Sequence, residues 1–334
     1  MVRIGINGFG RIGRYLLRVM HLFPQCEVVV INGHRSSNEE MAYLLKYDSV
    51  HGRFPGKVQA TENGLKIDDD EIAITRCGKG EWKWADYGVD IVVETSGTLK
   101  TREGLALHMG CGAKKVIISA PAKQPDMTVV MGVNHNDYDP AKHHILSNAS
   151  CTTNCLAPIV KILNEKFGVK LGSMVTVHSY TNDQRILDLP HKDLRRARAA
   201  ALNIIPTSTG AAKAVAEVIP AMKGRFGGYA LRVPTPTVSA VDFTAILEKP
   251  TTTEELVAAF REAAEGELKG ILAVNDLPLV SMDFKGEEHS SVVESEYCSV
   301  QEGTLAKVVA WYDNEWGYSV RVADLICHMQ SKGL

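Results

Sequence analysis

A cysteine among small hydroxyl and amide residues is the feature of this 334-residue chain best suited to chemistry. Cys151 lies within residues 147–155, which read Ser-Asn-Ala-Ser-Cys-Thr-Thr-Asn-Cys, and an apolar run after it predicts a helix. A thiol at the start of a helix lies near unpaired backbone N–H groups, which favour the thiolate. The pattern therefore predicts a nucleophile that attacks a carbonyl group.

A thiol nucleophile usually needs a neighbouring imidazole as its base. His178, near the end of the strand-like run 171–180, is the best-placed candidate. Two plainer interpretations remain open from these residues alone: Cys151 as an inert core thiol and His178 as a hydrogen-bonded core or loop residue. Pro158 predicts a kink or a break about two turns into the helix.

A glycine fingerprint opens the chain, after the strand-like residues 2–7 and at the start of a helix-like run over 11–22. In dinucleotide-binding domains, the first glycine permits a tight turn and the second admits a pyrophosphate. The third allows close packing of helix on strand. A glycine-rich turn without a ligand is the alternative. We predict that this segment binds a dinucleotide through Gly8, Phe9, Gly10, Arg11, Ile12 and Gly13.

The end of the second predicted strand, residues 27–32, should carry an acidic residue that binds the adenosine ribose. Residues 33–37 hold no carboxylate there. They offer space at Gly33, a guanidinium at Arg35 and hydroxyl groups, which suit a 2′-phosphate. The alternative is a solvated turn. The sequence predicts NADP use, with NAD possible, through Gly33, His34, Arg35, Ser36 and Ser37.

A second cluster of hydroxyl groups, residues 207–210, leads into the helix-like run 211–218. A helix start with free N–H groups binds phosphate or another anion. Arg196, Arg232 and Thr181 lie in segments that we expect to converge on the same place. Serine and threonine residues that only cap the helix are the alternative.

The order of elements predicts the fold class. Strand-like and helix-like runs alternate in the first half, as in a doubly wound parallel sheet of the Rossmann type. The second half has long alternating runs, residues 238–247 and 306–313, which predict an antiparallel sheet covered by helices. We predict a dinucleotide-binding domain over residues 1–150, completed by a C-terminal helix over 316–334, and a catalytic domain over 151–315. The predicted segments include a hairpin over 57–67, buried strands at 91–94 and 116–119, and helices at 39–47, 102–109 and 253–264.

Composition narrows the function classes. The net charge is −2, without a basic block for nucleic acid. Seven scattered cysteines without a CxxC motif do not form a disulfide framework or a zinc site, and they fit a reducing cytoplasm. We expect no metal, no signal peptide and no membrane span.

The chain closely resembles phosphorylating glyceraldehyde-3-phosphate dehydrogenases. The residues that carry the resemblance are 6–14 (INGFGRIGR), 46–52 (KYDSVHG), 119–121 (SAP), 147–158 (SNASCTTNCLAP), 191–198 (HKDLRRAR), 206–213 (PTSTGAAK) and 311–315 (WYDNE). They span the whole chain, and the central motif is highly specific.

The resemblance implies a reaction and residue roles. Cys151 is expected to form a thiohemiacetal that becomes a thioester after hydride transfer, and inorganic phosphate then releases an acyl phosphate. His178 is the expected base. The family has two anion sites. The site for the attacking phosphate is expected at Ser150, Thr152, Thr209, Gly210 and Arg232, and the site for the C3 phosphate of glyceraldehyde 3-phosphate at Thr181, Asp183, Arg196 and Arg232.

The resemblance also implies cofactor contacts and an assembly. Asn314 is expected to hold the nicotinamide carboxamide and Tyr318 to pack on its ring, with Ser96, Gly97 and Ser119 nearby. Residues 181–205 resemble the S-loop, which reaches a neighbouring subunit in a homotetramer. Within that loop, Leu189 and Pro190 are typical of NAD-specific members, whereas members that use NAD usually have aspartate at the position of Gly33.

Two other functions remain as alternatives. The related erythrose-4-phosphate dehydrogenases share most of these motifs. A non-catalytic nucleotide-binding relative would keep the fold without the reaction. The presence of the cysteine, the histidine and the arginines together favours an enzyme of central carbon metabolism that acts on glyceraldehyde 3-phosphate.

Overall fold

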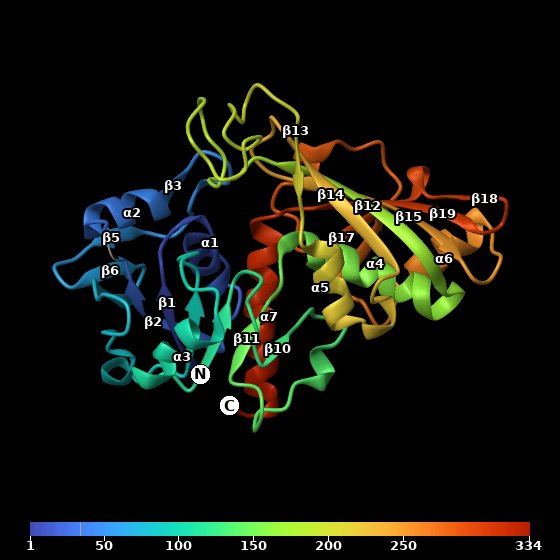
Figure 1. The fold of residues 1–334 in the computed structure, drawn as a ribbon. Helices are drawn as coiled ribbons and strands as arrows, with labels where there is room; N and C mark the ends of the chain where they lie inside the picture. The colour runs from blue at the N-terminus through green and yellow to red at the C-terminus, as the bar shows by residue number, and fades with distance from the viewer. Residues whose placement is uncertain (34) are drawn as a thin grey trace. The chain divides into compact units, whose positions relative to one another are not determined.

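The computed structural model describes residues 1–33 and 35–334. Their contacts form two compact units. The first contains Met1–Val129, His135–Ala149 and Ser319–Leu334, and the second contains Val130–Asn134 and Ser150–Tyr318. Each unit has a sheet of its own, shown in Figure 1. His34, predicted above to bind the cofactor, lies outside the described residues.

The first unit contains a nine-stranded sheet in the order β10-β11-β9-β8-β1-β2-β7-β6-β5. The pairs from β10 through to β7 are parallel, and β6 and β5 continue the sheet antiparallel. In chain order the strands are β1 (Val2–Asn7), β2 (Cys26–Asn32), β5 (Val58–Ala60), β6 (Gly64–Ile67), β7 (Asp70–Thr75), β8 (Ile91–Glu94), β9 (Lys115–Ile118), β10 (Met127–Thr128) and β11 (Ile145–Ser147). β8 and β9 are buried throughout, as expected for strands covered on both faces.

The helices of the first unit follow the predicted positions. They are α1 (Arg11–Met20), α2 (Asn38–Lys46), α3 (Arg102–Gly110) and most of α7 (Trp316–Lys332), with short helices η1 (Trp84–Tyr87) and η2 (His135–Asp137) and a small ladder of β3 (Tyr47–Asp48) and β4 (Gly52–Arg53). α2 begins with a capping box, in which Ser37 and Glu40 satisfy each other's backbone N–H groups. This cap sets where the helix starts.

The second unit contains an eight-stranded sheet in the order β13-β14-β12-β15-β19-β17-β16, with β18 paired to β19. Most pairs are antiparallel, but β12 pairs with β14 and β16 with β17 in parallel. The strands are β12 (Val169–Ser179), β13 (Ile205–Ser208), β14 (Phe226–Val233), β15 (Ser239–Leu247), β16 (Leu272–Asn275), β17 (Ser291–Glu294), β18 (Ser299–Gln301) and β19 (Leu305–Tyr312). The predicted fold class, a Rossmann-type sheet plus a mostly antiparallel sheet, is confirmed.

Helix α4 (Cys151–Phe167) packs against β12, β15, β17 and β19, beside α5 (Figure 1). The break predicted at Pro158 is wrong, because α4 continues for nine residues beyond it. The side chains of Leu156, Ala157, Ile159 and Val160 are fully buried around the proline, and this packing offsets the hydrogen bond that proline cannot donate. The other helices are α5 (Ala211–Val218), α6 (Thr253–Glu265), η3 (Pro220–Met222), η4 (Ser281–Phe284) and η5 (Ser295–Tyr297).

None of the helices in the described residues combines the length and the apolar character that crossing a membrane requires.

Candidate active site

Cys151 is the first residue of α4, so the predicted helix start is confirmed. Ser150 is the N-cap: its backbone is extended, and its hydroxyl accepts a hydrogen bond from the Thr153 N–H at 3.1 Å. The preceding residue, buried Ala149, has φ +53°, a left-handed conformation that costs about 1 kcal/mol for a non-glycine residue. This bend and the cap together fix the direction in which the Cys151 side chain leaves the backbone.

Strand pairing brings a histidine and an arginine to the thiol. β12 and β14 run parallel with His178 opposite Arg232. The Cys151 Sγ lies 3.5 Å from the His178 Nε2, which is within hydrogen-bond reach for sulfur. The predicted nucleophile and base therefore meet directly, within one unit of the structure.

The other imidazole nitrogen of His178 has two polar neighbours. Its Nδ1 lies 2.7 Å from the carbonyl oxygen of Ser179, and Arg232 Nη1 donates to the same oxygen at 2.9 Å. Nδ1 also lies 2.8 Å from Arg232 Nη1, which can only donate, so Nδ1 faces one acceptor and one donor. The tautomer with the proton on Nδ1, donated to the Ser179 carbonyl, is the one in which His178 can act as a base toward Cys151. The Nε2 lone pair then faces the Cys151 thiol and can accept its proton.

Burial shifts the pKa values of both groups toward their neutral forms. Burial raises the pKa of the Cys151 thiol, although the Arg232 charge and hydrogen bonds from Thr152 oppose the shift. Burial, then the Arg232 charge, lowers the pKa of His178 to about 3. Burial therefore opposes the ionisation of Cys151 that its place at the helix start predicts.

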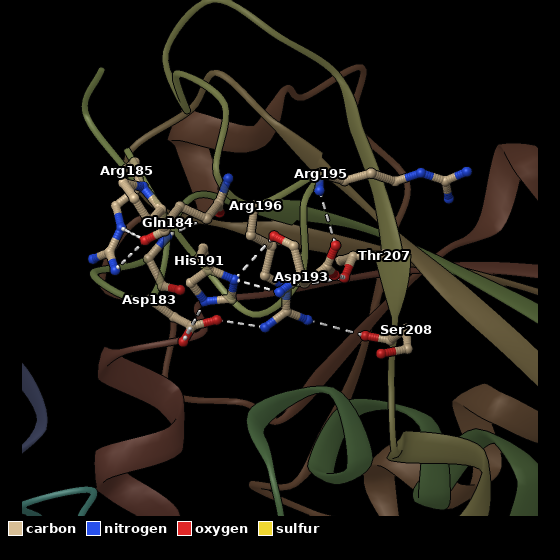
Figure 2. A network of polar contacts seen from close by, with 11 residues as sticks. Asp183, Gln184, Arg185, His191, Asp193, Arg195, Arg196, Thr207 and Ser208 are labelled. Atoms are coloured by element: carbon tan, nitrogen blue, oxygen red, sulfur yellow. Dashed lines mark hydrogen bonds and ion pairs between the residues drawn. The ribbon is translucent and has the colours of Figure 1, made fainter. Parts of the chain in front are cut away.

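Arg196 is the centre of the network shown in Figure 2. Its guanidinium donates to Asp183, to Thr207 Oγ1 at 2.9 Å and to the Ser208 carbonyl at 3.2 Å. Burial is the largest cause that lowers the pKa values of His178 and Arg232. The Arg196 charge lowers both pKa values further. The electrostatic fields of the two predicted arginines therefore overlap at His178.

Other residues predicted to bind anions lie apart from the arginines in the hydrogen-bond network. Gly210 is the N-cap of α5, without a side-chain cap, and Thr209 Oγ1 accepts from the first N–H of that helix at 3.3 Å. Thr181 donates its N–H to a neighbouring glutamine side chain at 3.3 Å. Within residues 1–33 and 35–334, no hydrogen bond joins Thr209 or Gly210 to Arg196 or Arg232.

Tyr312 is a buried polar residue that the sequence analysis did not single out. Its hydroxyl lies 2.9 Å from Thr152 Oγ1 and 2.9 Å from Thr176 Oγ1. Its ring lies edge-on to His178, with 6.0 Å between centroids. Thr152, predicted to contact phosphate, is thus buried with its hydroxyl on Tyr312. Only the alternation of β19 could have indicated that Tyr312 faces inward.

Asn314 is held by two serines. Its Oδ1 accepts from Ser179 Oγ at 2.9 Å and from Ser239 Oγ at 3.0 Å. With the oxygen occupied, the amide NH₂ group points away from these serines and is the side available to a ligand. Tyr318, in the first turn of α7, is buried.

The glycine loop in the first unit tests whether a dinucleotide fits. Gly8 has φ +95°, and a Cβ there would lie 2.7 Å from the Ser96 backbone. A Cβ on Gly13 would lie 2.5 Å from the Gly8 carbonyl oxygen. Gly10 differs, since a Cβ there meets nothing within 4 Å and its φ of −74° suits any residue. The chain itself does not require glycine at position 10, whereas a pyrophosphate that approaches the start of α1 does.

Two protein-family models match this chain. A family model described as "Glyceraldehyde 3-phosphate dehydrogenase, NAD binding domain" matches residues 2–102, and one described as its "C-terminal domain" matches residues 150–314. The glyceraldehyde-3-phosphate dehydrogenase of Geobacillus stearothermophilus is 58% identical over 334 residues, covering 100% of this chain and 99% of the relative. Glyceraldehyde-3-phosphate dehydrogenase 1 of Bacillus cereus is 56% identical over 335 residues, with both chains covered completely. This chain belongs to the glyceraldehyde-3-phosphate dehydrogenase family.

As a member of the glyceraldehyde-3-phosphate dehydrogenase family, the chain is an oxidoreductase with a nicotinamide cofactor. The resemblance and the enzyme class inferred from the sequence are confirmed. Among the described residues, no group of three or more His, Cys, Asp or Glu side chains is arranged to hold a metal ion.

A buried carboxylate supports the glycine loop of this dehydrogenase. Glu94 accepts hydrogen bonds from the Asn7 side chain at 2.5 Å and from the Ser96 N–H at 2.7 Å. His108 Nε2 lies 3.1 Å from the same carboxylate, and its Nδ1 lies 3.1 Å from the indole nitrogen of Trp84. The indole N–H can only donate, so the Nδ1 of His108 accepts this hydrogen bond and the Nε2 N–H donates to Glu94. The sequence analysis missed this network because its members are far apart in the chain.

The predicted 2′-phosphate pocket is only partly assembled. Arg35 is exposed. The Ser37 hydroxyl caps α2. A backbone hydrogen bond lowers the pKa of the Glu39 carboxylate most, and a hydrogen bond with the Ser37 side chain lowers it further. Arg76 donates to the Ser36 carbonyl at 2.8 Å, so a second guanidinium borders the turn. The sequence analysis did not single out Arg76 as a cofactor ligand.

Proposed function

We propose that this enzyme oxidises glyceraldehyde 3-phosphate and transfers the acyl group to inorganic phosphate, giving 1,3-bisphosphoglycerate in the reversible step of central carbon metabolism. The contact of 3.5 Å between Cys151 Sγ and His178 Nε2, in a chain of this family, carries the proposal. The same contact argues against a non-catalytic relative, which has no need for a base beside a thiol.

His178 accepts the thiol proton on Nε2 while its Nδ1–H stays bonded to the Ser179 carbonyl. The Cys151 sulfur then attacks the aldehyde carbon, and the protonated His178 returns the proton to the carbonyl oxygen, which gives a thiohemiacetal and restores the neutral imidazole. When bound, the nicotinamide cofactor supplies a hydride acceptor for the C1 hydrogen. His178 takes the proton from the hydroxyl, and phosphate oxygen attacks the resulting thioester, which returns the sulfur as a thiolate.

Arg232 has a double role in this proposal. Its Nη1 lies 2.8 Å from the Nδ1 of His178, and its buried Nε has no hydrogen-bond partner among the described residues. A buried unpaired donor costs about 1–3 kcal/mol, and a phosphate oxygen would recover this. Arg232 thus serves both anions. We assign the attacking phosphate to Ser150, Thr152, Thr209, Gly210 and Arg232, and the C3 phosphate to Thr181, Asp183, Arg196 and Arg232.

Thr152 and Asp183 act in these sites mainly by positioning. The Thr152 hydroxyl bonds to Tyr312, and its backbone lies in the first turn of α4. Asp183 is an anion that orients Arg196 rather than touching a phosphate. The structure thereby supports the arginines as the main source of affinity for the phosphate groups.

The cofactor is proposed to bind through the glycine loop, with Ser96, Gly97 and Ser119 along its path and Asn314 and Tyr318 at the nicotinamide. Gly8, Phe9, Gly10, Arg11, Ile12 and Gly13 form the loop and the first turn of α1. Arg11 donates to Asp48 Oδ2 at 3.1 Å, and this ion pair holds the first turn of α1 in place. The open space at Gly10 and the oriented amide of Asn314 support this assignment.

We propose that the enzyme accepts NADP and also uses NAD. Gly33, Arg35, Ser36 and Arg76 support a site for the 2′-phosphate, while the Glu39 carboxylate beside Ser37 favours a free ribose hydroxyl. The ratio of kcat/KM for the two cofactors tests this. Gly33→Asp should lower the ratio of kcat/KM with NADP to kcat/KM with NAD by tenfold or more.

Gly33→Ala is the matched control for that substitution, because any Cβ at this position meets Met41 Sδ at 2.6 Å and displaces it. The control separates the steric effect from the effect of charge. An NADP to NAD ratio that falls equally in both variants would contradict the proposed role of charge at the 2′-position.

We further propose a homotetramer in the cytoplasm, with the S-loop at a subunit contact. Six large apolar side chains of this loop are exposed, more than a solvent-facing loop needs: Ile186, Leu187, Leu189, Leu194, Leu202 and Ile204. The domain limits proposed for function are residues 1–150 with 316–334 for the cofactor, and 151–315 for catalysis. Sedimentation equilibrium tests the assembly, and a monomer at micromolar concentration would contradict it.

Substitution of the nucleophile and the base tests the proposed mechanism. Cys151→Ser should abolish turnover, and His178→Asn should lower kcat by about 10²- to 10⁴-fold. Cys155→Ser is the matched control, because Cys155 is a buried thiol in the same helix that contacts Ser291 instead of an imidazole. Equal activity losses in all three variants would point to disrupted packing of α4 and contradict the assigned roles.

A further inference from the structure

Two cysteines far apart in the chain touch each other in the first unit. Cys26, the first residue of β2, and Cys327, in α7, have their sulfur atoms 3.7 Å apart. They are separated by 301 positions in the chain. Among the hydrogen bonds of the described residues, this contact is the only one that joins two of the seven free cysteines. The distance is the van der Waals contact of two sulfurs, and a disulfide requires that it close to about 2.05 Å.

A polar donor supports ionisation of one member of the pair. Gln25 Nε2 donates to Cys327 Sγ at 3.0 Å, and the Cys26 thiol can donate its hydrogen to the same sulfur. Both hydrogen bonds stabilise negative charge on Cys327. The pair therefore has one sulfur suited to nucleophilic attack and a second sulfur in place to resolve the product.

A small reagent can reach the pair. Both side chains are only partly buried, and Gln25 and Pro24 beside them are exposed. A groove lined by Met1, Pro24, Cys26 and Glu27, among others, opens next to the first sulfur. Cys151 belongs to the other unit, where its sulfur contacts His178.

We propose that Cys26 and Cys327 form a redox-active dithiol, which low-molecular-weight disulfides convert to an intramolecular disulfide. The Cys327 thiolate attacks one sulfur of the small disulfide and displaces a small thiolate. Cys26 then loses its proton to solvent and attacks the Cys327 sulfur, displacing the second small thiolate. Two protein thiols are oxidised, and one small disulfide is reduced to two thiols.

The crosslink would join the start of β2 to α7 and close most of the chain into a loop. Such a link restricts the unfolded chain strongly, since the effect grows with loop length. The dithiol is thus a modification site that changes resistance to unfolding and does not require a change at the nucleophile.

Peptide mapping in a glutathione series tests the proposal on the intact enzyme. The protein is equilibrated at increasing ratios of oxidised to reduced glutathione, quenched with acid, alkylated and digested with trypsin without reduction. Cys26 lies in tryptic peptide 19–35, Cys327 in 322–332, and Cys151 and Cys155 share 143–161. We expect a disulfide-linked species of 19–35 with 322–332 that rises with the ratio, and a Tm several degrees higher in the crosslinked protein.

Single-thiol variants complete the test. Cys26→Ala and Cys327→Ala should each abolish the linked peptide and the Tm increase. Cys111→Ala is the matched control, since Cys111 is partly buried in the same unit and donates to the Gly80 carbonyl at 3.3 Å. Recovery of 19–35 and 322–332 only as alkylated thiols or separate mixed glutathione disulfides, even at the most oxidising ratio, would overturn the proposal.

Discussion

The three glycines of the cofactor loop should respond differently to alanine, and this difference tests whether the loop holds a dinucleotide. Gly8→Ala adds a Cβ 2.7 Å from the Ser96 backbone at a φ of +95°, and Gly13→Ala adds one 2.5 Å from a carbonyl oxygen. Each should lower the free energy of unfolding by at least about 2 kcal/mol, since backbone must move. Gly10→Ala meets nothing within 4 Å, so we expect a change of no more than about 1 kcal/mol.

Binding should show the opposite order for Gly10. A methyl group at this position occupies the space through which a pyrophosphate approaches the start of α1, so the Kd for the cofactor should rise at least tenfold, about 1.4 kcal/mol. Cofactor at one hundred times the wild-type Kd stabilises the wild-type protein by about 2.7 kcal/mol. The same concentration should stabilise Gly10→Ala by only about 1.4 kcal/mol.

Urea unfolding with and without cofactor measures both quantities in one assay. The reasoning requires that Gly10→Ala retain its stability without cofactor and lose about half of the cofactor-dependent increase. Unchanged cofactor stabilisation in Gly10→Ala would refute the placement of the pyrophosphate at this loop. A loss of stability as large as that of Gly8→Ala would refute the steric argument instead.

Three further predictions follow from buried polar groups. Tyr312→Phe removes a hydroxyl between Thr152 and Thr176 and should lower the free energy of unfolding by about 1–3 kcal/mol in urea titrations; no change would contradict these hydrogen bonds. Glu94→Gln weakens the support of the cofactor loop and should raise the cofactor Kd in fluorescence titrations, whereas an unchanged Kd would limit Glu94 to a structural role. Burial opposes ionisation of Asp48, but backbone and tyrosine hydrogen bonds and a nearby arginine outweigh it and hold its pKa below the usual range. This carboxylate therefore stabilises the fold fully above about pH 4, and the contribution declines as the pH falls toward the lowered native pKa, so Asp48→Asn should cost less stability at pH 3 than at pH 7; an equal cost at both would contradict the ionic contribution.

Local signals in the sequence were sufficient for the fold class and for the start of a helix at Cys151. The alternation of strands and helices predicted the parallel sheet, and the serine before Cys151 is indeed a helix cap. The glycine spacing predicted a loop whose first and third glycines are sterically required. These features depend on neighbouring residues, so periodicity and capping rules reach them.

Properties that depend on tertiary packing could not be predicted from the sequence. Burial reverses the expected direction for the Cys151 pKa, and packing carries α4 past Pro158. The bonds of Tyr312 and the contact of Cys26 with Cys327 join residues far apart in the chain. No local pattern encodes such pairs, because strand order and helix docking decide which side chains meet.

A phosphate-free burst experiment tests the central claim most directly. The enzyme is mixed with glyceraldehyde 3-phosphate and saturating oxidised cofactor without phosphate, and reduced cofactor is followed by absorbance in a stopped-flow instrument. If Cys151 holds the acyl group as a thioester, one reduced cofactor should form per active site, and turnover should then stall until phosphate is added. Rapid steady turnover without phosphate, or a burst that persists in Cys151→Ser, would contradict the account.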